Sequence, residues 1–151
     1  EQNIKMCKRN QSPFSLLYLD LDNFKNINDT YGHETGDNAL IHTSLTFLKI
    51  LREEDIVARL GGDEFVILCP GMKERKGIET VALKIIKSLG RETLIQNHSL
   101  SIQVSIGIAV YPRDADTTSD MIKSADSAMY QAKKNPEIGF CFYYDKSLVS
   151  G

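Results

Sequence analysis

The sequence predicts an α+β sandwich, in which a central and mostly antiparallel sheet is flanked by helices. Three observations predict it: apolar runs of strand length, apolar stripes of helical period, and the order in which the two alternate. That order is β-α-β-β-α-β-α-β, preceded by part of a helix over residues 1–10. Helices on one face of such a sheet give a ferredoxin-like or polymerase-palm arrangement.

The first strand is predicted over Phe14 to Leu21, where nearly every position is apolar, which indicates burial on both faces. Asp20 and Asp22 lie two positions apart at its end, so both point to one side of the strand. Residues 23–37 are rich in Asn, Asp and Gly and are expected to form a loop. A helix should follow from Asp37 to Leu51, because apolar residues recur there at spacings of three and four.

A hairpin comes next. Two short apolar strands, Asp55 to Leu60 and Phe65 to Cys69, enclose the tetrapeptide Gly61-Gly62-Asp63-Glu64. Two strands joined by Gly-Gly are typical of a hairpin, because glycine accepts the positive φ that tight turns need.

Four elements complete the chain. Gly77 to Leu94 carries one apolar stripe and is the clearest helix. Leu100 to Val110 alternates strictly between apolar and small or polar residues, which predicts a strand covered on one face. Thr118 to Lys134 is predicted to be a helix, and Phe140 to Tyr144 an edge strand.

Composition excludes several classes of protein. The chain has 151 residues, 20 acidic against 18 basic side chains and a net charge of −2, which argues against binding to a nucleic-acid polymer through bulk charge. No apolar run approaches the roughly 20 residues of a membrane helix. The three cysteines (Cys7, Cys69 and Cys141) are far apart, so we expect a reduced, cytoplasmic domain with no disulfide and no zinc site.

The candidate chemistry lies where the first strand and the hairpin meet. Taken singly, acids at a strand end, a Gly-Gly turn and the basic helix end Lys133-Lys134 are ordinary structural features. Together, Asp20 and Asp63 can converge, and paired carboxylates suit Mg²⁺ bound with substrate phosphates. Lys25 could neutralise phosphate oxygens. This equipment predicts metal-assisted phosphoryl or nucleotidyl transfer, and no GxxxxGK[ST] loop is present.

Several segments resemble one family in order and spacing, the GGDEF family of diguanylate cyclases. The signature Gly61-Gly62-Asp63-Glu64-Phe65 is intact, within RLGGDEFVILCPG. The other matching segments are LDLDNFKNINDTYGHETGD (19–37), VSIGIAVYP (104–112) and ADSAMYQAKK (125–134). The resemblance implies a fold like that of nucleotide cyclases and polymerase palms. It also implies one GGDEF domain over residues 1–151, excised from a larger multidomain signalling protein, with its first helix cut short.

The resemblance implies an activity, the condensation of two GTP into cyclic di-GMP with release of two pyrophosphates. It also implies that two domains face each other as a transient homodimer to carry it out. Asp20, Asp63 and the Leu21 carbonyl match the ligands of Mg²⁺, for which Mn²⁺ could substitute. Glu64 matches the acid that helps to activate the 3′-hydroxyl and to hold the metal. Asp63 and Glu64 are therefore the expected catalytic residues.

Substrate and product contacts follow from the same resemblance. Asn28 and Asp37 match the pair that reads guanine, which carries N1 and N2 donors that adenine lacks. Phe24, Lys25 and Lys133 match phosphate contacts. Arg52 and Asp55 match the RxxD site of product inhibition, and Lys84 matches a supporting position there. The alternative for RxxD is an ordinary exposed ion pair at i, i+3.

Three departures from the family pattern stand out. Glu137 occupies the position of an expected Arg beside the triphosphate, where an acid would weaken GTP binding. Asn23 replaces a bulky residue, with little effect expected. The family's DxLTGLxNR segment is absent, which we attribute to truncation upstream of Glu1.

The second hypothesis is a regulatory module that binds GTP or cyclic di-GMP with little or no turnover. Glu137 supports it, and so does the trailing FCFYYDKSL, which resembles the junction between a GGDEF domain and an EAL phosphodiesterase domain. On either hypothesis the expected partners are GTP, cyclic di-GMP and a fused EAL or sensor domain. The domain should make no membrane contact of its own, although its parent could be membrane-anchored.

Overall fold

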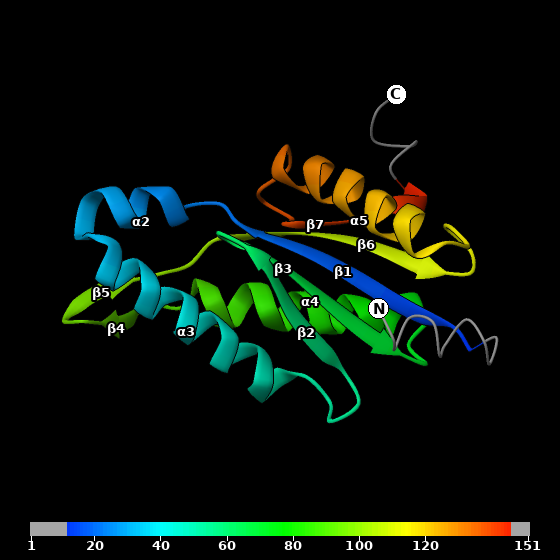
Figure 1. Cartoon of the computed structure of the whole chain (residues 1–151), viewed down its shortest axis with the longest axis horizontal. Helices are drawn as coiled ribbons and strands as arrows, with labels where there is room; N and C mark the ends of the chain where they lie inside the picture. The colour runs from blue at the N-terminus through cyan, green and yellow to red at the C-terminus, as the bar shows by residue number, and fades with distance from the viewer. Residues whose placement is uncertain (1–11, 146–151) are drawn as a thin grey trace.

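The computed structural model describes residues 12–145, and the predictions for residues 1–10 and for Cys7 lie outside that range. Five strands form the central sheet: β1 (Phe14–Leu21), β2 (Ile56–Gly61), β3 (Glu64–Pro70), β6 (Val104–Tyr111) and β7 (Phe140–Phe142). Their order across the sheet is β2-β3-β1-β6-β7 (Figure 1). All neighbours are antiparallel except β6 and β7, so the predicted α+β class with a mostly antiparallel sheet is confirmed.

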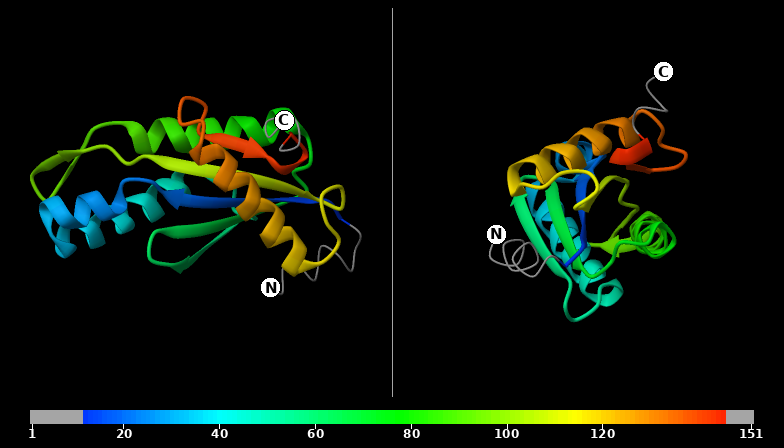
Figure 2. Two further views of the ribbon diagram at one scale, coloured as in Figure 1. Left: turned by 90° about the horizontal axis from the view of Figure 1, so that it is seen from above. Right: turned by 90° about the vertical axis from the view of Figure 1, so that its right-hand side faces the viewer.

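The helices are α2 (Phe24–Tyr31), α3 (His33–Ile50), α4 (Arg75–Gly90), α5 (Thr118–Lys133) and a short 3₁₀ turn, η1 (Tyr143–Asp145). They cover both faces of the sheet, whereas the sequence predicted one (Figure 2). Leu17 and Leu19 of β1 pack with the core under α3 and α4. Leu16 and Tyr18, on the other face of β1, pack against α5.

Strand β6 shows why the prediction of a half-covered strand was wrong. Seven of its eight residues are buried. The face predicted to be solvent-exposed carries Ser105, Gly107 and Ala109, all of them buried, and α5 packs closely against Gly107 and Ala109. Small residues on a strand therefore marked a helix contact and not exposure to water.

The segment 23–37 was also predicted wrongly, since it contains α2 and the first turn of α3 instead of a loop. Its helical signal is short: Phe24 and Ile27, three apart, are the residues of α2 that pack into the core. Gly32, with φ of 95°, breaks the chain direction between α2 and α3.

A hairpin after α4 was missed. Helix α4 ends at Gly90, earlier than predicted, and β4 (Thr93–Ile95) pairs with β5 (His98–Leu100). The two turn residues, Gln96 and Asn97, have φ of 49° and 68°. This hairpin lies beside α2 and the start of α3 at one end of the molecule (Figure 1).

The predicted Gly-Gly hairpin is confirmed, since Gly61 pairs with Glu64 and both glycines have positive φ. Cys69 is a buried free thiol. No helix within residues 12–145 is both long and apolar enough to cross a bilayer.

Candidate active site

Three acidic residues lie at the same end of the central sheet, two of them on adjacent strands and one in the turn between β2 and β3. Asp20 of β1 pairs directly with Glu64, the first residue of β3. Asp63 occupies the turn before Glu64, and its carbonyl oxygen accepts a hydrogen bond from the Leu21 amide at 3.1 Å. The strand register thus brings together the acids that the sequence singled out.

Their charges interact. The pKa of Asp63 is raised above its ordinary value, first because the side chain is partly buried and then because of the charge on Asp20. Burial also raises the pKa of Asp126 on α5, followed by the charges on Glu64 and Asp20. Acids that raise one another's pKa repel, so this end of the sheet favours a bound cation.

Lys133, at the end of α5, supplies one cation. Its ammonium forms an ion pair with Asp20 Oδ2. Burial lowers the pKa of Lys133, but its hydrogen bond to Asp20 and the nearby acids outweigh that effect and raise it. The second oxygen of Asp20, Oδ1, is buried and has no hydrogen-bond partner. A buried carboxylate oxygen left unpaired is a position that a metal ion could occupy.

Two further residues of this site were missed by the sequence analysis. The Tyr18 hydroxyl donates a hydrogen bond to Glu64, and the pKa of Tyr18 is raised, first by burial and then by that contact. Asp126 of α5 lies near enough to Glu64 and Asp20 for their charges to raise its pKa, after the effect of burial. The sequence spacing could have indicated both residues. Tyr18 lies two residues before Asp20, on the same face of a strand, and Asp126 lies seven residues before Lys133, on the same face of a helix.

Asp22 is held by a different neighbour. Ser105 of β6 donates to its two carboxylate oxygens at 2.9 and 2.8 Å. Burial nonetheless raises the pKa of Asp22, and this is the largest influence on it.

The donor set fits a hard divalent cation. Asp20, Asp63 and Glu64 offer carboxylate oxygens, which Mg²⁺ and Mn²⁺ prefer. Within residues 12–145, no three or more His, Cys, Asp or Glu side chains are grouped closely enough to hold a metal ion by themselves. An open arrangement suits Mg²⁺, which takes one or two carboxylates and completes its shell with water and phosphate oxygens.

The predicted phosphate contacts lie at the start of α2, directly after β1. Lys25 is exposed there, whereas Phe24 packs against the core and anchors the helix. Asn23 secures this turn, since its side chain donates to Ser101 O at 3.0 Å and accepts from Gln103 N at 3.1 Å.

The predicted guanine pair lies on α2 and α3. Asn28 is in the last turn of α2 and its side chain rests against Gly36 of α3. Asp37, the next residue, lines an open depression of about 340 Å³. The other residues that line it are Leu40, Ile41, Ser44, Leu45 and Arg59.

The residues matched to product inhibition lie at the opposite end of α3, roughly 20 Å from Asp37 at the usual helical rise. Arg52 binds the Asp55 carboxylate through Nε at 3.1 Å and Nη2 at 2.7 Å, and donates to Pro70 O at 2.9 Å. The Asp55 side chain is 1% exposed. Lys84 is exposed on α4. In this state RxxD forms an intramolecular ion pair.

Glu137 lies in the turn that follows α5. The turn is closed by Asn135 O, which accepts from the amides of Ile138 and Gly139, both at 3.1 Å. The Glu137 side chain is exposed, four residues beyond Lys133.

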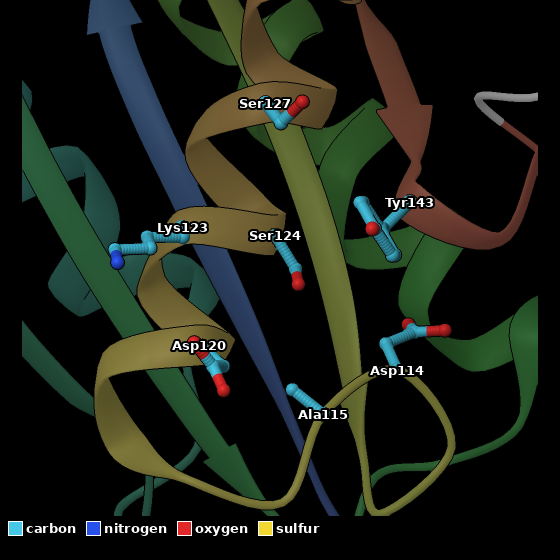
Figure 3. Close-up of a pocket in the computed structure, with 7 residues that line it drawn as sticks. All are labelled: Asp114, Ala115, Asp120, Lys123, Ser124, Ser127 and Tyr143. Carbon is cyan, nitrogen blue, oxygen red and sulfur yellow. The ribbon is translucent and has the colours of Figure 1, made fainter.

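A separate depression of about 430 Å³ lies at the other end of α5 (Figure 3). It is lined by Asp114, Ala115, Asp120, Lys123, Ser124, Ser127 and Tyr143. None of the residues that the sequence singled out lines it, so it is distinct from the acidic end of the sheet.

The repulsion around Asp63 predicts that Asp63→Asn raises the unfolding temperature near neutral pH. Because the folded-state pKa of Asp63 lies above its ordinary 3.8, the ionised form opposes folding. That penalty is fully present above the folded-state pKa and vanishes as pH falls below the unfolded one. Thermal unfolding of both proteins from neutral to acidic pH checks this. An advantage of the variant that persisted in strong acid would contradict the charge argument.

Comparison with known proteins gives one consistent result. A sequence profile described as "Diguanylate cyclase, GGDEF domain" matches residues 1–137. Over 143 residues the chain is 41% identical to the bifunctional diguanylate cyclase/cyclic di-GMP phosphodiesterase MucR of Pseudomonas aeruginosa, which covers 95% of this chain and 21% of that protein. The diguanylate cyclase TpbB of the same species is 37% identical over 132 residues, 30% of its length.

Solved structures agree. The isolated GGDEF domain of P. aeruginosa TpbB (also called YfiN) superimposes with a TM-score of 0.88 at 32% identity, over 99% of this chain and 88% of that one. An EAL/GGDEF domain protein from M. capsulatus gives a TM-score of 0.84 at 40% identity, over 94% and 92% of the two chains.

Proposed function

The chain belongs to the GGDEF family of diguanylate cyclases, and on that premise we propose that it condenses two GTP into cyclic di-GMP and two pyrophosphates. The convergence of Asp20, Asp63 and Glu64 at one sheet end, beside Lys133, supports this most strongly. The chain spans only a fifth to a third of MucR and TpbB, at 21% and 30% of their lengths, so activity is proposed for this domain alone.

In the proposed reaction, two copies of the domain face each other, each with one GTP. The 3′-hydroxyl of each ribose attacks the α-phosphorus of the other GTP. A new P–O bond forms and the bond to the β-phosphate oxygen breaks, so pyrophosphate leaves. A bound Mg²⁺ or Mn²⁺ would polarise the phosphate oxygens.

The chain's own residues then have distinct tasks. Asp20 and Asp63, with the Leu21 carbonyl, would hold the metal. Glu64 would accept the proton of the 3′-hydroxyl, with the Tyr18 hydroxyl fixing its orientation. Lys133 pairs with Asp20 in this structure and would turn to the phosphates when GTP and metal arrive.

The remaining substrate contacts follow the family pattern. Phe24 and Lys25 would cradle phosphates, and Asn28 and Asp37 would read guanine. Product inhibition would act through Arg52, Asp55 and Lys84. For Arg52 to bind a guanine edge it must give up part of its present pairing with Asp55.

A second candidate function rests on Glu137. An acid four residues after Lys133 lowers the positive potential where a triphosphate would lie. The domain would then bind GTP or cyclic di-GMP with little turnover and regulate a neighbouring domain. MucR, which is named as a cyclase and a phosphodiesterase together, shows that a matching domain occurs in such a bifunctional protein. For both functions we place the domain in the cytoplasm, where GTP is available.

Glu137→Arg tests the role of this residue. We expect GTP affinity to rise about tenfold, because a repulsive charge becomes an attractive one near the triphosphate. Asp116→Arg is the matched control, since it makes the same change of charge at an exposed position at the far end of α5. Equal affinity in the Glu137→Arg variant and the unaltered protein, measured by titration calorimetry, would show that Glu137 points away from the nucleotide.

The experiment that tests the proposed function is a GTP turnover assay with Mg²⁺, with products separated by chromatography. The cyclase predicts cyclic di-GMP at a rate that rises with the square of protein concentration while dimers are scarce. Binding of GTP without product, over the whole range of concentration, would favour the regulatory module. Protein that neither binds nor converts GTP would contradict both.

A further inference from the structure

The close packing of Asn28 on Gly36 carries an inference about nucleotide specificity, and it rests on the proposed function. Helices α2 and α3 are joined by the single residue Gly32. The Gly32 amide donates to Asn28 O at 2.8 Å, and the Gly36 amide donates to Gly32 O at 3.1 Å. This tight connection lays the last turn of α2 against the first turns of α3.

Position 36 leaves no room for a side chain. A Cβ atom built on Gly36 would lie 1.7 Å from Asn28 Oδ1 and 2.8 Å from its Cγ. The next nearest atom is Asn28 Nδ2, at 3.5 Å. The space that a Cβ would need is therefore filled by one group, the amide of Asn28.

The backbone does not require glycine here. Gly36 is buried within α3 and does not have positive φ. Glycine weakens a helix relative to alanine, so α3 is less stable with glycine at position 36 than it would be with alanine. What the absence of a side chain at position 36 allows is the close packing of the Asn28 amide against α3.

The β4–β5 hairpin contacts the end of α2 and the start of α3, and so limits how far the two helices can move apart. Gln96, at the tip of the β4–β5 hairpin, accepts a hydrogen bond from Thr35 Oγ1 at 3.0 Å and donates to Glu34 Oε1 at 3.0 Å. The rings of Tyr31 and His98 pack at 4.5 Å between centroids. If a methyl group were added at position 36, the Asn28 side chain would have to turn away.

We propose that Gly36 is a specificity-positioning residue: by admitting the Asn28 amide against the backbone of α3, it fixes that amide beside Asp37 for recognition of guanine. Gly36 does not touch the nucleotide and acts through Asn28. The proposal predicts that GTP affinity falls without a loss in the stability of α3, whereas replacing a merely structural residue would lower both together. Gly36→Ala should weaken GTP binding while helix α3 becomes no less stable.

The test compares four proteins: the unaltered chain, Gly36→Ala, Asn28→Ala and the double variant. Affinity for GTP and for ATP is measured with Mg²⁺, and thermal unfolding is recorded for each. We expect Gly36→Ala to lower GTP affinity about tenfold, to leave ATP affinity unchanged and to unfold at an equal or higher temperature. The double variant should bind GTP no more weakly than Asn28→Ala alone, because the clash involves only the amide that Asn28→Ala removes.

Gly77→Ala is the matched control, because Gly77 is also helical and, apart from the neighbouring backbone of its own helix, no atom lies within 4 Å of its Cβ position. It should leave GTP affinity unchanged. Equal GTP affinity in Gly36→Ala and the unaltered chain would overturn the proposal, and so would additive losses in the double variant.

A failure of the proposed function is distinguishable from a failure of this inference. If the unaltered chain binds no GTP, the proposed function fails, and the side-chain amide resonances of Asn28 then decide the packing claim. Those resonances should shift strongly in Gly36→Ala and not in Gly77→Ala. Unshifted resonances would overturn the inference by themselves.

Discussion

Glu64→Gln is expected to lower the rate of cyclic di-GMP formation by at least about a thousandfold while the domain remains folded, the loss typical when a general base or metal-bound acid is removed. Glutamine has nearly the same size as glutamate, and its carbonyl oxygen can still accept the hydrogen bond from Tyr18. What is lost is the negative charge. The change therefore removes a candidate proton acceptor and metal ligand without leaving a cavity.

The same substitution should not destabilise the protein. The charge on Glu64 helps to raise the pKa of Asp126, so its removal relieves repulsion at this end of the sheet. Thermal unfolding and GTP turnover, measured on the same samples, separate the two effects. Tyr18→Phe is the informative comparison, because it keeps the ring and removes only the hydroxyl that orients Glu64. Its rate of cyclic di-GMP formation should lie between that of the unaltered protein and that of Glu64→Gln. Unchanged turnover in Glu64→Gln would rule out the proposed role.

Much of the fold could be predicted because its strands carry strong local patterns. Nearly every position from Phe14 to Leu21 is apolar, and the Gly61-Gly62 pair is typical of a hairpin turn. The β4–β5 hairpin could not be found in this way, because its strands have three residues each and its turn uses Gln96, a residue that seldom adopts positive φ. Its position is set by contacts with α3, which are far away in the sequence.

The candidate site shows the same division. Asp20, Asp63 and Glu64 were predictable because they lie at the ends of recognisable strands, and register then forces Asp20 beside Glu64. Tyr18 and Asp126 were not predicted, since their importance depends on α5 covering the face of the sheet that looked exposed. The assignment of roles to Asn28, Asp37 and Arg52 came from family resemblance, and no geometric pattern in the sequence could have supplied it.

The close approach of α5 gives the second large prediction: Gly107→Ala should destabilise the fold by about 3 kcal/mol or more. A Cβ on Gly107 would lie 2.0 Å from Ala125 O and 2.1 Å from Met129 N, both backbone atoms of α5. No side-chain rotation relieves such contacts, so the helix must lift from the sheet. Overpacking a core usually costs about 1–3 kcal/mol, and a clash with backbone belongs at or above the top of that range.

The expected damage extends to the site, because α5 carries both Lys133 and Asp126. A lifted helix would break the ion pair between Lys133 and Asp20 before the domain unfolds. Urea unfolding measures the loss of stability, with Gly77→Ala as the control that should be neutral or stabilising by up to about 1 kcal/mol. If Gly107→Ala unfolded at the same urea concentration as the unaltered chain, α5 could not be packed on β6 as closely as described. That packing is what holds a cation from α5 against the carboxylate of β1.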